Sequence, residues 1–408
     1  MTDPSMLDSS GKCDVLIVGA GPSGAAAGIE LARAGARVVV LDRARFPRHK
    51  TCGDALSNRA VALVDDLAPG DLAATPSASV AGALAIFPDG ATIGRSYGDE
   101  PGRIVPRFAL DLLLRRALER AGAEVHEGVM VRRLLSEGGR VVGAEGDAGR
   151  WRAGTVIAAD GPGSIGWEAL GEAYPRGRTL AVSATAYFEG VAPGPREGWS
   201  EHHFHADLPC GYGWIFPAVE GLSNVGVYLR SDAYASSPSR LRALFDAFLA
   251  REAARFGPAK RVGTVRSWAL PLAGALSRRR GVPGLLLTGD AGRAIDPLTG
   301  EGIWQALHTG RLAGTIAAKH LAAGGVGDDA VREYERACAA VLDRPARMRA
   351  LVQDGVRALV SLGLYRAAPV QALLRWGYAS GSLETSKTVH GGGSADASKP
   401  IDGSGRPA

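Results

Sequence analysis

Three glycines near the start of the chain have the spacing that a phosphate-binding turn requires. The string GAGPSG places Gly19, Gly21 and Gly24 directly after a short β-branched run and at the start of an alanine-rich stretch. In such a turn the first glycine permits the tight bend, the second lets the backbone approach a pyrophosphate, and the third lets helix and strand pack closely. The free N–H groups and positive dipole of the helix start then face the phosphates. Alone the pattern is weak, because glycine-rich turns recur in many folds.

An acidic residue follows at the distance expected of a dinucleotide site. Asp42 ends a second β-branched run, residues 37–41, and its carboxylate can accept hydrogen bonds from both hydroxyls of an adenosine ribose. The neighbouring Arg43 is a further candidate contact. Because an acid at position 42 would repel a 2′-phosphate, the segment favours FAD or NAD over NADP. Strand, helix, second strand and acid together predict a dinucleotide-binding site.

A second glycine-rich stretch favours FAD over NAD. Residues 285–310 contain an apolar run ending in Gly289 and Asp290, followed by a loop that leads into a helix. The loop and the start of that helix contribute four more candidate contacts, Pro297, Gly300, Gly302 and Ile303. Asp290 can hold a ribityl hydroxyl, while the helix N-terminus faces the edge of an isoalloxazine ring that becomes anionic on reduction. An NAD enzyme does not need this second glycine-rich segment, which would contact no phosphate. We call residues 289–303 the second cradle.

Two smaller features complete the cofactor prediction. The string AADGPGS contains Asp160 and Gly161 at the end of another apolar run, and Arg107 lies just before a predicted helix, where it is a candidate phosphate contact. Taken singly, the first pair could be an ordinary turn and Arg107 a surface cation. Their order along the chain with the other two motifs favours the cofactor-binding interpretation.

The residues that could contact a substrate are mostly aromatic. Strand alternation puts Tyr212, Trp214 and Phe216 on one face, either as core packing or as a wall that binds hydrocarbon by burial, at roughly 0.8 kcal/mol per CH₂. Cys52, which precedes Gly53, is either a buried structural residue or a group that orients substrate or donates a proton.

Three histidines raise the question of a metal. His203 and His205 would share one strand face, and His202 directly precedes them in the sequence. No third ligand is apparent at a suitable spacing, so the sequence predicts no metal site.

The order of these motifs resembles that of the aromatic-hydroxylase-like FAD oxidoreductases, to about residue 320. Two strings, FPRHKTCGDALS at 46–57 and PCGYGWIFPAVEGLSNVGVYL at 209–229, are similar to signatures of the geranylgeranyl reductase family of isoprenoid-saturating flavoenzymes. The second string fits that family's Tyr-x-Trp-x-Phe-Pro pattern followed by a glycine, here Gly226. The resemblance implies that the aromatic residues and Gly53 line a cavity over the flavin, with Cys52 at its edge. It also implies hydride transfer from the reduced flavin N5 to one alkene carbon and protonation of the other, with Cys52 and Tyr212 as candidate proton donors.

Other functions stay open at this point. A flavin monooxygenase or halogenase uses the same fold, but halogenases usually carry Trp-x-Trp-x-Ile-Pro and an upstream lysine, and no lysine lies between Lys50 and Lys260. This disfavours halogenation and leaves hydroxylation and dehydrogenation open. A non-catalytic prenyl-binding carrier would not need complete flavin motifs. Because no second GxGxxG unit is present, the electron donor is either NADPH visiting the same face or a reduced carrier such as ferredoxin.

The elements that must position these residues predict an α/β fold. We expect a Rossmann-type FAD-binding domain, an inserted antiparallel sheet that binds substrate, and a C-terminal helical region. The strands expected for the inserted sheet are 179–190, 201–205, 212–216 and 224–229. The expected FAD-binding domain is discontinuous, over 12–72, 103–175 and 283–327. The remaining ranges are 73–102 and 176–282 for substrate binding, 328–382 for the helices, and 383–408 for a disordered tail.

The amino-acid composition limits the expected partners and cellular location of the protein. The formal charge of +5 reflects an arginine-rich composition, and the short groups of basic residues have no interleaved aromatics and no DNA-binding motif, so no nucleic-acid partner is expected. The 4 cysteines are far apart, and no signal peptide or spanning segment is evident, which predicts a cytoplasmic protein. Arginines among leucines in the C-terminal helices are either solvated on packed helices or rest on an anionic membrane, which would suit a lipid substrate.

Overall fold

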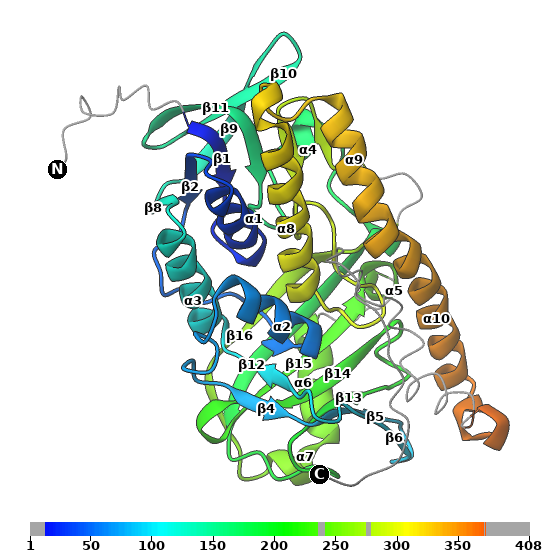
Figure 1. Ribbon diagram of the computed structural model, residues 1–408. Helices are drawn as coiled ribbons and strands as arrows, with labels where there is room; N and C mark the ends of the chain where they lie inside the picture. The colour runs from blue at the N-terminus through cyan, green and yellow to red at the C-terminus, as the bar shows by residue number, and fades with distance from the viewer. Residues whose placement is uncertain (1–12, 236–240, 275–278, 371, 373–408) are drawn as a thin grey trace, which may run out of the picture.

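The computed structural model describes residues 13–235, 241–274, 279–370 and 372. The predicted tail, 383–408, and the end of the predicted helical region lie outside these residues. The described part combines two large β-sheets, a small third sheet and helices packed around them (Figure 1). The predicted α/β fold class is confirmed.

The first sheet has a parallel core that begins with the N-terminal strand. Its strand order is β17-β18-β11-β1-β2-β8, and β1 pairs in parallel with both β2 and β11. The strands are β1 Cys13–Val18, β2 Val38–Asp42, β8 Glu124–Glu127, β11 Gly149–Ala158, β17 Gly281–Val282 and β18 Leu285–Leu287. Residues of β1 and β2 are almost all buried, which explains why both read as continuous apolar runs rather than as alternating patterns.

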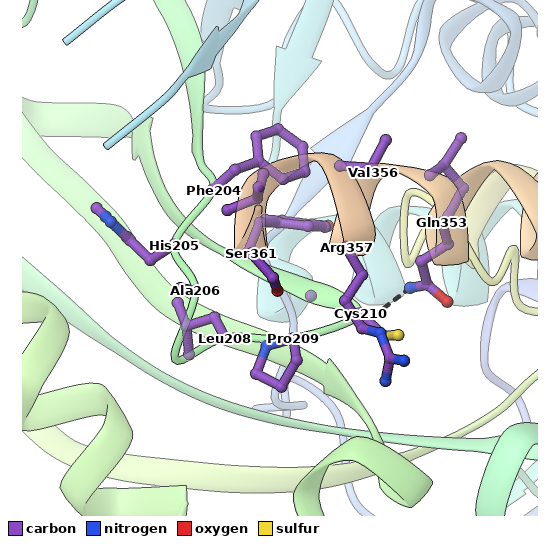
Figure 2. Close-up of a pocket in the computed structure, with 14 residues that line it drawn as sticks. Phe204, His205, Ala206, Leu208, Pro209, Cys210, Gln353, Val356, Arg357 and Ser361 are labelled. Atoms are coloured by element: carbon purple, nitrogen blue, oxygen red, sulfur yellow. Dashed lines mark hydrogen bonds between the residues drawn. The ribbon is translucent and has the colours of Figure 1, made fainter. Parts of the chain in front are cut away.

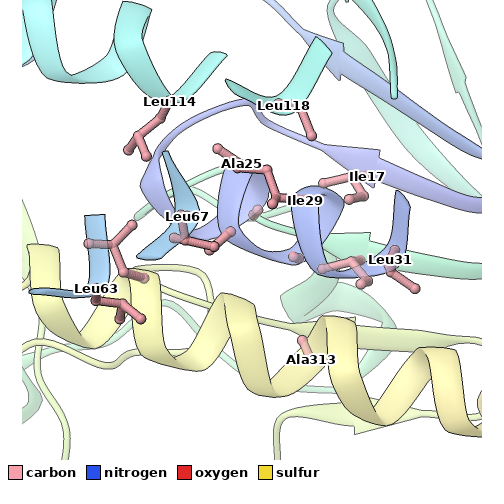
Figure 3. Close-up of a cluster of buried hydrophobic side chains, with 14 of the residues drawn as sticks. Ile17, Ala25, Ile29, Leu31, Leu63, Leu67, Leu114, Leu118 and Ala313 are labelled. Carbon is pink, nitrogen blue, oxygen red and sulfur yellow. The ribbon is translucent and has the colours of Figure 1, made fainter. Parts of the chain in front are cut away.

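Helices cover one face of this sheet (Figures 1 and 3). They are α1 Pro22–Arg33, α2 Asn58–Leu67, α3 Arg107–Arg120 and α8 Ile303–His320. The backbones of α1 and α8 approach closely, because a Cβ on Gly310 would lie 2.1 Å from the carbonyl oxygen of Ser23 and one on Gly314 would lie 2.6 Å from that of Ala27. The small residues of both helices therefore fix how the glycine-rich turn before α1 sits against the start of α8.

A β-hairpin and a short helix cover the other face. The hairpin consists of β9 Val131–Glu137 and β10 Arg140–Gly146, and β10 pairs with β11. Helix α4 Gly166–Ala169 places Trp167 in this second core, where its Nε1 donates to the carbonyl oxygen of Ala291.

The second sheet has 7 strands in the order β16-β12-β15-β14-β13-β5-β6. These are β5 Gly82–Ile86, β6 Thr92–Ser96, β12 Leu180–Glu189, β13 Trp199–His203, β14 Gly211–Pro217, β15 Leu222–Arg230 and β16 Lys260–Pro271. One face packs on α6 Leu241–Arg251, and the other carries aromatic residues that face the first sheet's loops. A 3-stranded sheet of β3 Ala55–Leu56, β7 Gly102–Ile104 and β4 Ala78–Val80 lies between the two.

The C-terminal helices run from the first sheet to the second (Figure 1). α9 Asp328–Cys338 contributes Val331, Tyr334 and Cys338 to the core of the first sheet, and α10 Arg344–Ser361 continues it after a π-helical turn, η5 Ala339–Asp343. Shorter elements are η2 Gly177–Thr179, η3 Val219–Gly221, α5 Ser231–Ala235, α7 Ala253–Phe256, η4 Leu321–Ala323 and η6 Leu364–Arg366. Within the described residues no helix combines the length and apolarity needed to cross a bilayer.

Candidate active site

The three glycines of the first turn have distinct surroundings. Gly19 has φ +101°, and a Cβ there would lie 2.4 Å from the carbonyl oxygen of Ala159. A Cβ on Gly24 would lie 1.8 Å from the carbonyl oxygen of Gly19. At Gly21, by contrast, the one described heavy atom within 4 Å of a Cβ is Nη2 of Arg48, at 3.7 Å. The fold therefore needs glycine at positions 19 and 24, whereas the bare backbone at position 21 faces open space.

Asp42 is hydrogen-bonded to the turn that it follows. Its Oδ2 accepts from the N–H of Ala20 and its Oδ1 from that of Ala44, both at 2.8 Å. The carboxylate is almost buried and joins the end of β2 to the glycine turn. Because each carboxylate oxygen can accept more than one hydrogen bond, the group still has capacity for ribose hydroxyls. Arg43, the next residue, is exposed at the same strand end.

The two arginines near the glycine turn differ in their environments. Arg107 begins α3 and is 5% exposed, and its guanidinium makes a bidentate pair with Asp111 at 2.8 Å. Arg48 pairs with the same carboxylate at 2.9 Å, and its other end lies beside Gly21. Arg48, which the sequence interpretation did not single out, is thus better placed for a phosphate than Arg107. No spacing in the sequence points to it, because it reaches the turn from a loop.

The second cradle lies against the start of α1. Gly289 has φ +60°, and a Cβ there would lie 2.6 Å from the hydroxyl oxygen of Ser23 in α1. Asp290 follows, and its Oδ2 pairs with Nζ of Lys50 at 3.1 Å. Gly302 is the N-cap of α8, and Ile303 is the first helical residue. A Cβ on Gly302 would lie 3.9 Å from Oδ1 of Asp290. The structure brings the first turn, the second turn and the N-termini of two helices together.

The Asp160-Gly161 pair lies at the end of β11, next to the first turn. Asp160 Oδ2 accepts from the N–H of Ile165 at 2.9 Å, while its Oδ1 is buried without a hydrogen-bond partner among the described residues. Burial raises the pKa of this carboxyl. Gly161 has φ +87° and no described heavy atom within 4 Å of a Cβ. An unpartnered acceptor beside open backbone is the pattern expected of a ligand contact.

The aromatic residues of β14 form a buried wall. Tyr212, Trp214 and Phe216 are between 5% and 7% exposed and share one face of the strand. His202 on the neighbouring strand contacts Tyr212 and Phe216 edge-on, at 5.1 Å between ring centroids in each case. We call these four residues the aromatic wall.

Hydrogen bonds tie this wall to the second cradle. The Tyr212 hydroxyl donates to the carbonyl oxygen of Thr299, and the Tyr228 hydroxyl donates to that of Pro297 at 2.8 Å. Gly300 has φ +67°, and a Cβ there would meet the Tyr228 ring at 3.2 Å and the Tyr212 hydroxyl at 3.3 Å. The loop before α8 is therefore held against the aromatic residues of the second sheet by these hydrogen bonds and by close packing at Gly300.

Cys52 and Gly53 lie beside the wall. A Cβ on Gly53 would lie 3.2 Å from the Phe216 ring, so the chain passes directly over that side chain. Cys52 is a free cysteine whose carbonyl oxygen accepts from Nδ2 of Asn224 at 2.9 Å. Burial raises the pKa of the Cys52 thiol, and the Arg107 guanidinium opposes this effect. The thiol consequently carries its proton at neutral pH.

A buried polar network supports Cys52, and sequence reasoning missed it. Asp54 Oδ2 accepts from the Tyr187 hydroxyl and from Nδ2 of Asn224, the latter at 2.9 Å. Asn224 Oδ1 in turn accepts from Nε1 of Trp214 at 3.0 Å and from the Thr185 hydroxyl at 2.9 Å. We call these five residues the Asp54 network. It joins the Cys52 loop to the wall, although its members come from four separate parts of the chain.

Asp54 itself is unusual in conformation and in charge. It has φ +62°, a region that non-glycine residues other than Asn and Asp seldom adopt, and it is 1% exposed. Burial raises the pKa of Asp54 to about 6, against hydrogen bonds from Tyr187 and Asn224 that lower it. The only sequence signal for Asp54 is its place in the string FPRHKTCGDALS.

An Asp54→Asn variant is expected to become more stable than the native protein as pH rises. A folded-state pKa of about 6, above the usual 3.8, means that folding favours the protonated form. The native protein therefore loses stability as pH rises from about 4 to about 6, by up to about 3 kcal/mol, whereas asparagine does not titrate. Asparagine also tolerates the positive φ. Urea unfolding of both proteins between pH 4 and pH 8 measures the difference. A difference that is independent of pH would contradict the assignment.

The residues at the two turns fit FAD. They supply two helix N-termini, open backbone at Gly21 and Gly161, an acidic group for a ribose at Asp42, and an unpartnered carboxylate oxygen at Asp160. The fold and these contacts define the class: a flavoprotein with a Rossmann-type FAD-binding domain. A family model described as an FAD-binding domain matches residues 12–348.

Comparison with known proteins narrows this class to a family. It is 34% identical over 327 residues to a menaquinone reductase of Mycolicibacterium smegmatis, covering 78% of each chain. It is 35% identical over 318 residues to digeranylgeranylglycerophospholipid reductase 1 of Methanopyrus kandleri, covering 74% of this chain and 80% of the relative. The chain belongs to the geranylgeranyl reductase family of FAD-dependent oxidoreductases, as the sequence resemblance predicted, and its cofactor is FAD.

Solved structures confirm the fold. A geranylgeranyl bacteriochlorophyll reductase-like protein from Thermoplasma acidophilum superposes with a TM-score of 0.74 at 23% identity, covering 89% of this chain and 98% of that one. A flavin-dependent brominase superposes equally well, with a TM-score of 0.74 at 21% identity, covering 90% of this chain and 94% of that one. The fold is thus common to reductases and halogenases, and the substrate has to be argued from the site.

Proposed function

We propose that this enzyme reduces carbon–carbon double bonds in the isoprenoid chain of a lipophilic substrate, a prenyl quinone or a prenyl lipid. The observation that carries the proposal is the aromatic wall, which is hydrogen-bonded to the loop of the second flavin cradle. The names of the two relatives, a menaquinone reductase and a digeranylgeranylglycerophospholipid reductase, agree with such a substrate.

The wall suits a hydrocarbon because its members are uncharged. Burial lowers the pKa of His202 to about 4, so this imidazole is neutral at physiological pH. The Tyr212 hydroxyl is satisfied by Thr299, which leaves the ring as the accessible surface. Burial of a prenyl unit against such a surface contributes roughly 0.8 kcal/mol per CH₂, without any polar contact.

The residues near the wall would hold a proton for the reaction and position the reacting groups. Bound FAD, once reduced by NADPH or by a protein carrier, supplies the hydride. The Cys52 thiol holds a proton beside the wall, and the Asp54 network fixes the backbone of Cys52 and the ring of Trp214. Lys50 and Asp290 form an ion pair at the second cradle. Positioning and proton supply are therefore the protein's contributions.

A small cavity lies at the outer end of the wall. It has a volume of about 20 Å³ and is lined by residues of β14, the preceding loop and α10, among them Tyr212 and Val360. Phe204, Val356 and Arg357 also line it (Figure 2). A cavity of this size holds about one water molecule, so a prenyl chain entering here would have to part α10 from the sheet. We propose that the substrate enters between α10 and β14, at this cavity.

Anaerobic turnover tests the proposed function. The purified holoenzyme is reduced chemically and incubated with a polyprenyl quinone or a geranylgeranyl lipid, and the product mass is followed. A gain of two hydrogens per reduced bond supports the proposal. No mass change anaerobically, together with oxygen uptake under air, would indicate the monooxygenase or halogenase alternative. A protein purified without flavin that still binds the lipid would indicate a carrier.

The exposed face of α10 supports contact with a membrane. Met348, Leu351 and Leu362 are between 60% and 70% exposed and lie along one face of the helix, and Leu364 follows in η6. Arg344 is exposed at the start of the same face. Apolar side chains beside a cation are typical of a helix that rests in the headgroup region of an anionic membrane.

A double variant, Leu351→Ser with Leu362→Ser, is therefore expected to bind anionic vesicles at least about tenfold more weakly than the native protein, because each leucine loses apolar contact with the lipid. Co-sedimentation with phosphatidylglycerol vesicles measures the effect. Val262→Ser is the matched control, since Val262 is 44% exposed on β16. Equal binding of the double variant and the control would contradict membrane contact through α10.

A further inference from the structure

Two histidines and a glutamate meet on the outer face of the second sheet, away from the flavin site. His203 ends β13, His205 follows it, and Glu252 is the N-cap of α7, just after α6. One potential ligand atom from each residue lies within 4.8 Å of the other two. Nδ1 of His203 and Nε2 of His205 are both buried without a hydrogen-bond partner among the described residues.

A carboxylate orients the more buried histidine. His203 is 2% exposed, and its Nε2 lies 3.0 Å from Oε2 of Glu201. Glu201 is itself held by Arg255, whose Nη1 and Nη2 donate to its two carboxylate oxygens at 2.5 Å and 3.1 Å. The ring is thus fixed with Nδ1 facing Glu252 Oε1, at 3.3 Å. A histidine held by a carboxylate at one nitrogen, with its other nitrogen facing a second potential ligand, is the usual arrangement of a metal-binding imidazole.

We propose that His203, His205 and Glu252 bind a zinc ion. Two imidazole nitrogens and one carboxylate oxygen are a ligand set that zinc adopts, with a water molecule completing the tetrahedron. Ligand atoms around zinc are about 3.3 Å apart. His203 Nδ1 and Glu252 Oε1 already have this separation, and the wider separations, at most 4.8 Å, have to contract by up to about 1.5 Å. His205 and Glu252 are only partly buried and can make this movement. The sequence-based expectation of no metal depended on a missing third ligand, which the fold supplies from residue 252.

The position of the site indicates a structural role. His202 lies on the face of β13 that carries the aromatic wall, whereas His203 and His205 contact the Phe248 ring of α6 on the opposite face. Zinc at this point would join β13 to the α6–α7 turn. It would stabilise the sheet that carries the wall without contact with flavin or substrate.

Metal analysis of the tag-free, FAD-containing enzyme tests the proposal. After dialysis against micromolar zinc and then metal-free buffer, we expect about one zinc per chain and a rise in the thermal midpoint relative to chelator-treated protein. His205→Gln and Glu252→Gln should each weaken zinc binding at least about tenfold, measured by competition with a chromophoric chelator. His320→Gln is the matched control, because His320 also lies beside a single glutamate, Glu333, at 3.2 Å.

The flavin content of each variant reports whether the fold is retained, since the site lies apart from the cofactor. Substoichiometric zinc in the native enzyme, with no effect of zinc on its thermal midpoint, would overturn the proposal. Zinc binding by both variants with the native affinity would also overturn it. In either case the contacts of His203 with Glu201 and Glu252 form a hydrogen-bonded cluster that holds no metal.

Discussion

A Gly21→Val variant is expected to lose FAD while its apoprotein stays folded. A Cβ at position 21 has Nη2 of Arg48 as its one described neighbour within 4 Å, at 3.7 Å, so we expect the fold itself to accommodate a side chain there. The same side chain occupies the space through which the backbone approaches the pyrophosphate. We expect the affinity for FAD to fall at least about 100-fold, which corresponds to about 3 kcal/mol. The ratio of flavin absorbance to protein, and FAD titration of the apoprotein, measure the loss.

Two other glycines provide the comparison. Gly24→Ala places a Cβ 1.8 Å from the carbonyl oxygen of Gly19, so it should lower the thermal midpoint of the apoprotein as well as its affinity for FAD. Gly327→Val adds a side chain at the N-cap of α9, where no described heavy atom lies within 4 Å of a Cβ, and should leave the affinity for FAD unchanged. Tight FAD binding by Gly21→Val would mean that the pyrophosphate does not lie on this turn.

Replacing Cys52 by alanine is expected to lower the rate of double-bond reduction about 100-fold, the usual contribution of a positioned general acid. The buried thiol retains its proton at neutral pH and lies at the edge of the wall. Tyr212, the other proton-donor candidate, donates its proton to the carbonyl oxygen of Thr299. Tyr212→Phe should therefore slow the reaction less than tenfold. Single-turnover mixing of the prereduced enzyme with a prenyl substrate measures both rates.

Flavin spectra and substrate affinity distinguish a chemical effect from a structural one. Both variants should retain FAD, and Cys52→Ala should bind substrate normally, because the network holds the backbone carbonyl rather than the thiol. A native rate for Cys52→Ala together with a 100-fold loss for Tyr212→Phe would reverse the assignment. Near-native rates for both would place the proton donor elsewhere.

The glycine turns were predictable because their requirements are local. Gly19 needs positive φ and Gly24 needs contact with a carbonyl oxygen of the same turn, so both constraints operate within six residues. The same holds for the βαβ unit and for the alternation of Tyr212, Trp214 and Phe216 along one strand. Strand β16, in contrast, was not predicted, because it lies at the sheet edge and is largely exposed, so its charged residues carry no apolar pattern.

The sequence by itself determined the fold class, the cofactor and the family, since these depend on backbone turns and on periodicities that a short segment contains. The tertiary structure alone decided which cation lies near the first glycine turn: Arg48 approaches Gly21, whereas Arg107 is buried against Asp111. It also brought Asp54 to Tyr187 and Asn224, and Glu252 to His203. Such groupings join residues tens to more than a hundred positions apart. Their geometry depends on how two sheets pack, and no local preference of the chain encodes that packing.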